Sequence, residues 1–230
     1  MDSDINVDFS DQIKFNALNE LGYQGPRLFE EKDYQEFKYL DIDIKKLLDF
    51  PPPLNHSKQT LNELAEVKEI TEREHPESYT SKLEEMDKDP SGFIYKYYKE
   101  LTGKELPKKF VKIIESKDVD TLAIKLKLFY NRPRPYEIAL KNKVYLKYNK
   151  KIQKKGTAGS PSYPSGHTMI AYFAAHVAAH VNPEFKEQLL KRAEWVAYSR
   201  MYEGVHFRSD NDFSVYLVEN VLMPAFLKAI

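Results

Sequence analysis

Apolar residues recur at helical spacing over most of the chain beyond residue 57. The first clear instance has four apolar residues at three-residue steps, with charged residues between them: Leu61, Leu64, Val67 and Ile70. Ser57 or Thr60 is a suitable N-cap, because a short hydroxyl side chain can accept a hydrogen bond from a free N–H group of the first turn. The pattern therefore predicts an amphipathic helix that begins near residue 57.

Similar spacing predicts helices along the rest of the chain. The expected ranges are 78–86, 91–101, 107–114, 118–130, 168–181, 183–202 and 210–230. Gly103 suits the end of the second of these helices, and Asn182 followed by Pro183 suits the start of the sixth. Apolar residues are too dense in 118–130 for a helix with one buried face, so we expect this helix to be central. No stretch alternates as strands do, and the predicted fold class is all-α.

Three stretches lack a sustained period. Residues 1 to about 39 are polar and mixed, and residues 40–50 fit a short helix or an extended arm that ends at three consecutive prolines. Residues 136–160 are expected to form a long, lysine-rich loop, for which two interpretations stay open: a rim or lid beside a site, or a solvated surface excursion. We therefore expect an N-terminal extension over 1–44 and one domain over 45–230.

Composition and charge exclude several classes of protein. The 230 residues carry 35 Lys+Arg and 35 Asp+Glu, so the overall charge indicates neither a nucleic-acid partner nor an anionic membrane surface. The chain has no cysteine, hence no disulfide framework. Polar residues interrupt the most apolar segments, 169–181 and 213–230, so no membrane span is expected. The acidic N-terminus is unlike a secretory signal. The sequence predicts a soluble protein, cytoplasmic if this is the full-length product and periplasmic or secreted if a signal peptide was removed.

Cationic and histidine side chains gather in three separate pieces of the sequence. The pieces are Lys127 with Arg132-Pro133-Arg134-Pro135, then Pro164-Ser165-Gly166-His167-Thr168, then Ser199-Arg200 followed by His206 and Asp210. Lysine and arginine can surround the oxygens of a phosphoryl group with charged donors, and a small-residue turn can add backbone N–H donors without bulk. Two histidines can then divide nucleophilic attack and proton transfer. The pattern predicts a phosphoryl-transfer site that needs no metal.

These pieces resemble the signature of the phosphatidic acid phosphatase type 2 and vanadium-dependent haloperoxidase superfamily. Within it, the chain is most similar to the soluble bacterial class A non-specific acid phosphatases, over Ser162–Thr168, Phe129–Pro135 and Ser199–Asp210. The similarity extends loosely to Leu47-Leu48 and the prolines that follow, and covers about residues 45–230. It implies a single-domain helical bundle of the acid phosphatase and vanadium haloperoxidase type, a small phosphate ester as substrate, no cofactor and a homodimer.

The resemblance also implies a role for each motif residue. His206 is expected to be the nucleophile that forms a phosphohistidine, Asp210 to orient its ring, and His167 to be the general acid. A second frame, in which Lys125 and Arg132 take the first motif's places, has the same spacing and stays open. The expected ligands of the substrate phosphate in the preferred frame are Lys127, Arg134, Ser165, Gly166 and Arg200.

The leading interpretation is a phosphatase that hydrolyses phosphate monoesters and transfers phosphate to alcohols. A vanadium-dependent haloperoxidase would hold vanadate in the same anion site, and a lipid or diphosphate phosphatase would share the motif but usually spans a membrane. A binding module without catalysis would be expected to have lost a histidine, and none is lost. His176 and His180 have the four-residue spacing of metal ligands. The nearest acid, Glu184, follows a helix break, so we expect no metal site there.

Overall fold

The computed structural model describes Gly22, residues 36–147 and residues 158–230 of the chain. Every regular element in this part is helical, which confirms the predicted all-α class. The first elements are the 3-10 helix η2 (Ile44–Leu47), α2 (Lys58–Glu72), α3 (Glu77–Thr80), α4 (Leu83–Lys88), α5 (Pro90–Thr102) and α6 (Lys108–Ile114). They are followed by α7 (Asp118–Tyr130), α8 (Pro135–Lys141), α10 (Gly166–Val181), the 3-10 helix η3 (Pro183–Phe185), α11 (Lys186–Tyr202), α12 (Arg208–Leu217), the π-helical turn η4 (Val218–Leu222) and α13 (Met223–Ala229).

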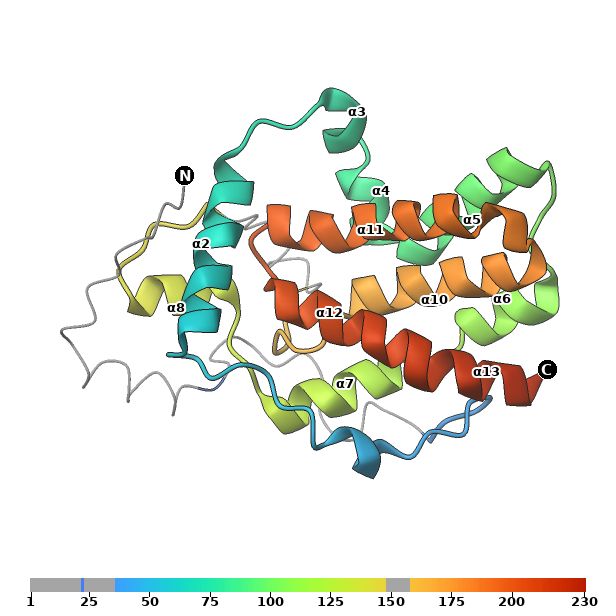
Figure 1. Ribbon diagram of the computed structural model, residues 1–230, viewed down its shortest axis with the longest axis horizontal. Helices are drawn as coiled ribbons and strands as arrows, with labels where there is room; N and C mark the ends of the chain where they lie inside the picture. The colour runs from blue at the N-terminus through green and yellow to red at the C-terminus, as the bar shows by residue number, and fades with distance from the viewer. Residues whose placement is uncertain (1–21, 23–35, 148–157) are drawn as a thin grey trace.

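Helix α10 lies at the centre of the bundle. It packs along α11 and also contacts α5, α12, α7 and α6, and Figure 1 shows it between α11 and the line formed by α12 and α13. A helix surrounded on all sides needs apolar residues all round and small residues where neighbours approach. Four alanines without exposed surface meet this need: Ala171, Ala174, Ala175 and Ala178. No helix in the described ranges is long and apolar enough to cross a membrane.

Helix ends lie where the sequence provides caps. The Ser57 hydroxyl accepts the Thr60 N–H at 3.2 Å at the start of α2, which confirms one of the two expected caps. Gly103 has φ of 70° and ends α5, since glycine enters the left-handed region without steric cost. Asn131 has φ of 49° and ends α7. This turn at Asn131 sends the chain away from α7 directly before the Arg-Pro-Arg-Pro segment.

One carboxylate ties residues 38–40 to the bundle. Asp118, at the start of α7, accepts the backbone N–H groups of Lys38, Tyr39 and Leu40 at 2.7–2.9 Å. The Leu40 side chain is buried in the main core. Most of the expected extension lies outside the described residues, so the division of the chain at residue 45 stays a prediction.

The expectation of a loop over 136–160 is wrong for its first part. Residues 135–141 form α8, because Pro135 occupies the first helical position and the Glu137 carboxylate accepts the Arg134 N–H at 2.8 Å. The sequence pattern does not predict this helix, since its apolar positions cover only two turns. Residues 148–157, the centre of the expected lysine-rich loop, lie outside the described residues. The predicted helix over 78–86 is two short helices, α3 and α4.

Candidate active site

The two arginines of the first motif, Arg132 and Arg134, contact different partners. Arg134 donates to the backbone carbonyls of Ser160 and Val205, both at 2.8 Å, and its Nη1 lies 2.9 Å from Nε2 of His206. Lys127 is buried in the last turn of α7 and donates to the Pro161 carbonyl at 2.5 Å. These carbonyls hold the two cations in place beside His206, so the expected pair of phosphate ligands lies in one buried cluster.

The alternative frame places its two cations elsewhere. Lys125 Nζ lies 5.4 Å from the centre of the Phe37 ring, on another side of α7 from Lys127. Arg132 pairs with Asp210 at 2.6 Å and does not contact His206 through any hydrogen bond that the structure records. The geometry therefore favours Lys127 with Arg134 as the pair that faces the second histidine.

His206 and Asp210 form the pair that the sequence predicted. His206 Nδ1 lies 3.1 Å from Oδ2 of Asp210, and the same oxygen accepts the Phe207 N–H at 2.9 Å. An ionised carboxylate only accepts, so Nδ1 carries the proton and Nε2 presents its lone pair towards Arg134. Both side chains are almost completely buried. A neutral ring whose unprotonated Nε2 faces the buried cations has the geometry of a nucleophile.

Electrostatics keep the pair in this protonation state. Burial, with the charges of Arg134 and Lys127, holds the pKa of His206 well below its usual range against the opposing pull of Asp210. Burial raises the pKa of Asp210, but Arg132 and the hydrogen bonds from His206 and Phe207 outweigh it, so the pKa lies below its usual range. Asp210 is therefore ionised and His206 neutral near pH 7.

His167 is held by a residue that the sequence analysis did not find. Its Nε2 lies 2.9 Å from the backbone carbonyl of Asp87 on α4. A carbonyl only accepts, so Nε2 carries a proton and Nδ1 is the ring atom that can exchange one. Burial and the charge of Arg200 lower the pKa of His167 well below its usual range, although the bond to Asp87 opposes this shift. Nothing in the sequence distinguishes Asp87 from other acids of its short helix.

Arg200 has N–H donors that are available to an anion. Its Nη1 donates to Asp87 Oδ1 at 2.8 Å and to Glu203 Oε2 at 2.6 Å. Its Nε and Nη2 are buried and have no hydrogen-bond partner among the described residues. Buried donors are nearly always satisfied, so two open donors on one fully buried guanidinium indicate a place for an acceptor from outside the protein.

The small-residue turn before His167 has a more structural role than expected. Ser165 donates its N–H to Ser214 Oγ at 2.9 Å and to the Asp210 carbonyl at 3.2 Å, so this N–H is not free for an anion. The Ser165 hydroxyl caps α10 and pairs with the Thr168 hydroxyl at 2.9 Å. A Cβ at Gly166 would meet its nearest atom only at 4.0 Å, so the protein's own packing does not require glycine there.

The other two α10 histidines lie apart from this cluster. His176 faces Glu219 at 3.6 Å, and His180 lies against the rings of Phe110 and Phe226. Among the described residues, no three histidine and acidic side chains are grouped as metal ligands. The pair thus has separate packing partners despite its spacing.

A family comparison matches the part of the chain that carries these motifs. Residues 118–219 match the model of the PAP2 superfamily. This part of the chain resembles the PAP2 superfamily. It includes all eight motif residues predicted from the sequence. Asp87 and α2 precede the PAP2 region, which is why motif reasoning could not find the residues there that support it.

Curated relatives and solved structures extend the comparison. The chain is 36% identical over 109 residues to a non-specific acid phosphatase of Providencia stuartii, a match that covers 47% of this chain and 41% of the relative. It is 31% identical over 109 residues to the non-specific acid phosphatases of Salmonella typhimurium and Salmonella typhi, over 45% of this chain and 42% of each relative. The match thus spans less than half the length of these relatives.

The overall fold has a counterpart among solved structures. A bacterial vanadium-dependent iodoperoxidase superposes with a TM-score of 0.56 at 16% identity, over 96% of this chain and 64% of that one. The likeness confirms the predicted helical architecture. At this identity it concerns the fold alone.

Proposed function

We propose that the protein is a phosphatase that hydrolyses phosphate monoesters through a phosphohistidine on His206. The observation that carries the proposal is the His206–Asp210 pair, with neutral Nε2 aimed into a cluster of buried cations. The open Nε and Nη2 donors of Arg200 support it, because a phosphoryl group needs charged donors around its oxygens. The similarity to non-specific acid phosphatases supports the same class of substrate.

In the first step, His206 Nε2 attacks phosphorus in line with the departing oxygen. The N–P bond forms as the P–O bond to the alcohol breaks, and Asp210 stabilises the charge that develops on the ring through Nδ1–H. His167 donates the proton from Nδ1 to the leaving oxygen, which departs as the alcohol. Lys127, Arg134 and Arg200 stabilise the equatorial oxygens in the transition state.

Protonation of His167 is coupled to substrate binding in this mechanism. Burial and the charges of Arg200, Lys127 and Arg134 lower the pKa of His167 before binding, so the ring is then neutral. A phosphate dianion cancels part of that field, and the pKa of His167 rises when it binds. The acid form is therefore generated in the complex, where it is needed.

In the second step, neutral His167 accepts a proton from water, which attacks phosphorus and breaks the N–P bond. Inorganic phosphate leaves, and His206 returns to its neutral form with the proton still on Nδ1. An alcohol that takes the place of water would receive the phosphoryl group instead. This accounts for a phosphotransferase side activity in the proposed function.

Vanadate is expected to inhibit phosphatase activity competitively at low concentration. Five-coordinate vanadate bonded to His206 resembles the in-line transition state, and such analogues bind 10²–10⁸-fold more tightly than substrates. The measurement is release of p-nitrophenol from p-nitrophenyl phosphate with increasing vanadate, and with EDTA as a parallel addition. Loss of activity with EDTA, restored by a divalent ion, would contradict the metal-free mechanism. Halide oxidation by peroxide with added vanadate, and no phosphate release, would instead identify a haloperoxidase.

Lys127→Ala is expected to lower kcat/KM by roughly 10²–10³, about 3–4 kcal/mol, because it removes one charged donor to the transition state. Arg200→Ala should have a loss of similar size for the same reason. Lys125→Ala is the matched control, since Lys125 lies on the same helix and faces Phe37. Steady-state kinetics with p-nitrophenyl phosphate measure all three variants. An essential Lys125 with a dispensable Lys127 would show that the second frame is correct.

A further inference from the structure

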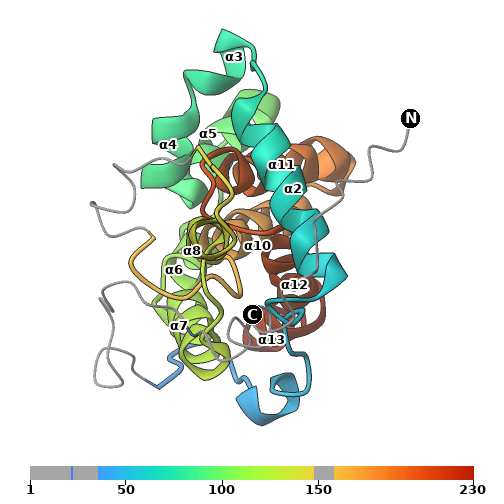
Figure 2. The same cartoon turned by 90° about the vertical axis from the view of Figure 1, so that its left-hand side faces the viewer.

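Arg132 joins the catalytic pair to helix α2. Its Nη1 donates to Asp210 Oδ1 at 2.6 Å and to the Ser209 hydroxyl at 2.8 Å. Its Nη2 lies 3.4 Å from Glu63 Oε2 and 3.4 Å from the Thr60 hydroxyl, both on α2. Figure 2 shows α2 crossing the bundle beside α11 and α12, so this single guanidinium connects two distant parts of the chain.

The contacts of Arg132 with Asp210 and Glu63 are buried and form part of a ring of interactions. The Arg132, Glu63 and Asp210 side chains are exposed by 1%, 9% and 0%. Ser209 completes a ring of contacts, because its hydroxyl donates to Glu63 Oε2 at 2.6 Å. The Phe207 ring lies 4.3 Å from the guanidinium carbon and covers one of its faces. A buried ion pair of this kind costs desolvation energy and is weak evidence for stability alone, so a role in catalysis is the more informative explanation.

We propose that Arg132 and Glu63 are positioning residues for catalysis, which hold Asp210 ionised and fixed so that His206 keeps its proton on Nδ1 and its lone pair on Nε2. The proposal rests on the proposed function, but its central claim concerns the protonation of His206 and can be measured without turnover. Arg132 lies in the first motif but has no assigned role in the preferred frame, and Glu63 lies outside the region matched to the PAP2 superfamily.

The two oxygens of the Asp210 carboxylate have different partners. Oδ1 accepts from Arg132 at 2.6 Å and lies 3.5 Å from Ser162 Oγ, while Oδ2 accepts from His206 and from the Phe207 N–H. The carboxylate therefore cannot rotate without losing a charged partner. Glu63 in turn holds Nη2 of Arg132. Because the guanidinium is planar and both of its terminal nitrogens are held, the position of the group is fixed.

The charge of Arg132 also sets how strongly Asp210 attracts a proton on His206. The charged groups that face the ring are Asp210, Arg134 and Lys127, and Asp210 itself faces Arg132. Without Arg132, the Asp210 carboxylate would lose its arginine partner, and its negative charge would act more strongly on the His206 ring. The ring would then bind a proton more readily, and a protonated ring has no lone pair on Nε2 for attack.

The test is a proton NMR titration of ¹⁵N-histidine-labelled protein, with the His206 signals assigned by their loss in His206→Ala. Arg132→Met is expected to raise the His206 pKa by about one unit or more, which corresponds to a tenfold change in the protonation equilibrium. The acidic limb of the pH profile of kcat/KM should move to higher pH by the same amount, because attack requires the neutral ring. Arg132→Lys keeps the charge and should shift the pKa by less than half as much.

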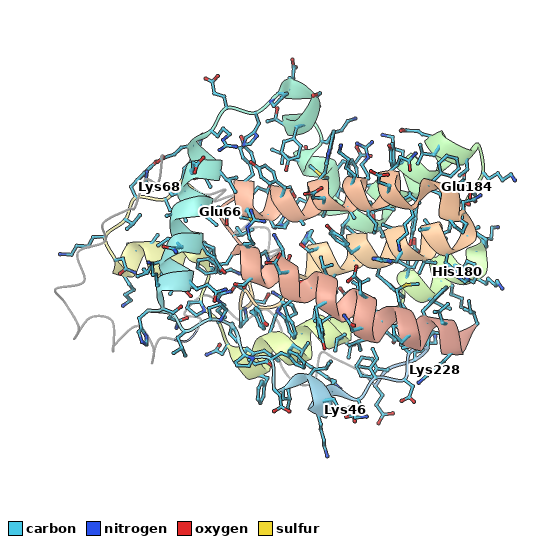
Figure 3. All side chains as sticks on the ribbon, in the orientation of Figure 1. Lys46, Glu66, Lys68, His180, Glu184 and Lys228 are labelled. Atoms are coloured by element: carbon cyan, nitrogen blue, oxygen red, sulfur yellow. The ribbon has the colours of Figure 1, made fainter. Side chains whose placement is uncertain are left out.

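Glu66→Gln is the matched control. Glu66 (Figure 3) lies on α2, three residues after Glu63, and pairs with an arginine as Glu63 does, namely Arg208 of α12. This pair is partly exposed and does not reach Asp210. The control should leave both the His206 pKa and kcat/KM unchanged. A shift in Glu66→Gln equal to that in Arg132→Met would mean that any loss of α2 contacts perturbs the ring, and would overturn the proposal.

Two further variants keep the proposal testable if Arg132→Met does not fold. In Arg132→Lys and Glu63→Gln the charge beside Asp210 is kept, and kcat is expected to fall at least about tenfold with KM changed less than twofold, as for loss of transition-state positioning. An unchanged or lowered His206 pKa in folded Arg132→Met, or unchanged kcat in both milder variants, would overturn the proposal. Failure of the proposed function would look different, because the wild type would then lack turnover while the NMR shift was still observed.

Discussion

His206→Ala is expected to abolish turnover of every phosphate ester, with kcat lowered by ~10⁵–10⁶ as when a covalent nucleophile is removed. No other histidine in the described residues is paired with a buried carboxylate at hydrogen-bond distance in this way, so no phosphoenzyme could form in its absence. The measurement is kcat for p-nitrophenyl phosphate and for an alkyl phosphate, together with trapping of labelled protein after an acid quench.

His180→Ala is the control for this experiment. His180 is exposed near the end of α10 (Figure 3) and should be replaceable with wild-type activity. Binding of vanadate should also fall sharply in His206→Ala, since the bond to Nε2 is lost. Retained turnover with a labelled phosphoenzyme in His206→Ala would show that another residue is the nucleophile.

His167→Ala is expected to separate substrates by their leaving group. An alkoxide must be protonated as it departs, so hydrolysis of an alkyl phosphate should fall by about 10²–10⁴, the usual contribution of general acid catalysis. p-Nitrophenolate leaves without protonation, so its release should be much less affected. The phosphoenzyme should then accumulate, because its hydrolysis lacks the base that His167 provides.

A rapid quench with p-nitrophenyl phosphate measures this accumulation. His167→Ala should give a burst of p-nitrophenol close to one equivalent, and a labelled protein that is stable in alkali and labile in acid. The wild type should give a smaller burst under the same conditions. A burst in His206→Ala and none in His167→Ala would reverse the assignment of the two histidines.

The parts of the fold that the sequence predicted well are those with local causes. The helix that begins at Ser57, the end of α5 at Gly103 and the bounds of α7 each depend on a cap or a period within a few residues. The helix α8 was missed, because its start depends on the Glu137 side chain and on a proline that also reads as a helix breaker. Features that depend on a cap or a period within a few residues could be predicted, and a start that depends on a side-chain contact could not.

Some residues of the candidate site could likewise be predicted from local sequence, and others could not. The residues proposed for catalysis could be found from motif spacing, since their types and order carry the chemistry. Asp87 and Glu63 could not, because each reaches the site from a helix that is distant in sequence, and an acid on a helix surface looks the same whether it meets solvent or a buried arginine. Ser165 could be placed beside the site, but only its contacts with Asp210 and Ser214 show that its N–H is occupied.

The first turn of α12 has a consequence for how the site is assembled during folding. Asp210 accepts the Phe207 N–H, so the carboxylate that orients His206 also determines where this helix starts. If the helix began one residue earlier or later, Asp210 would lose its contacts with both the Phe207 N–H and His206 Nδ1. The start of α12 and the orientation of the His206 ring are therefore determined together. The start of α12 and the contact between Asp210 and His206 therefore form together, and substrate need not expend binding energy to create that contact.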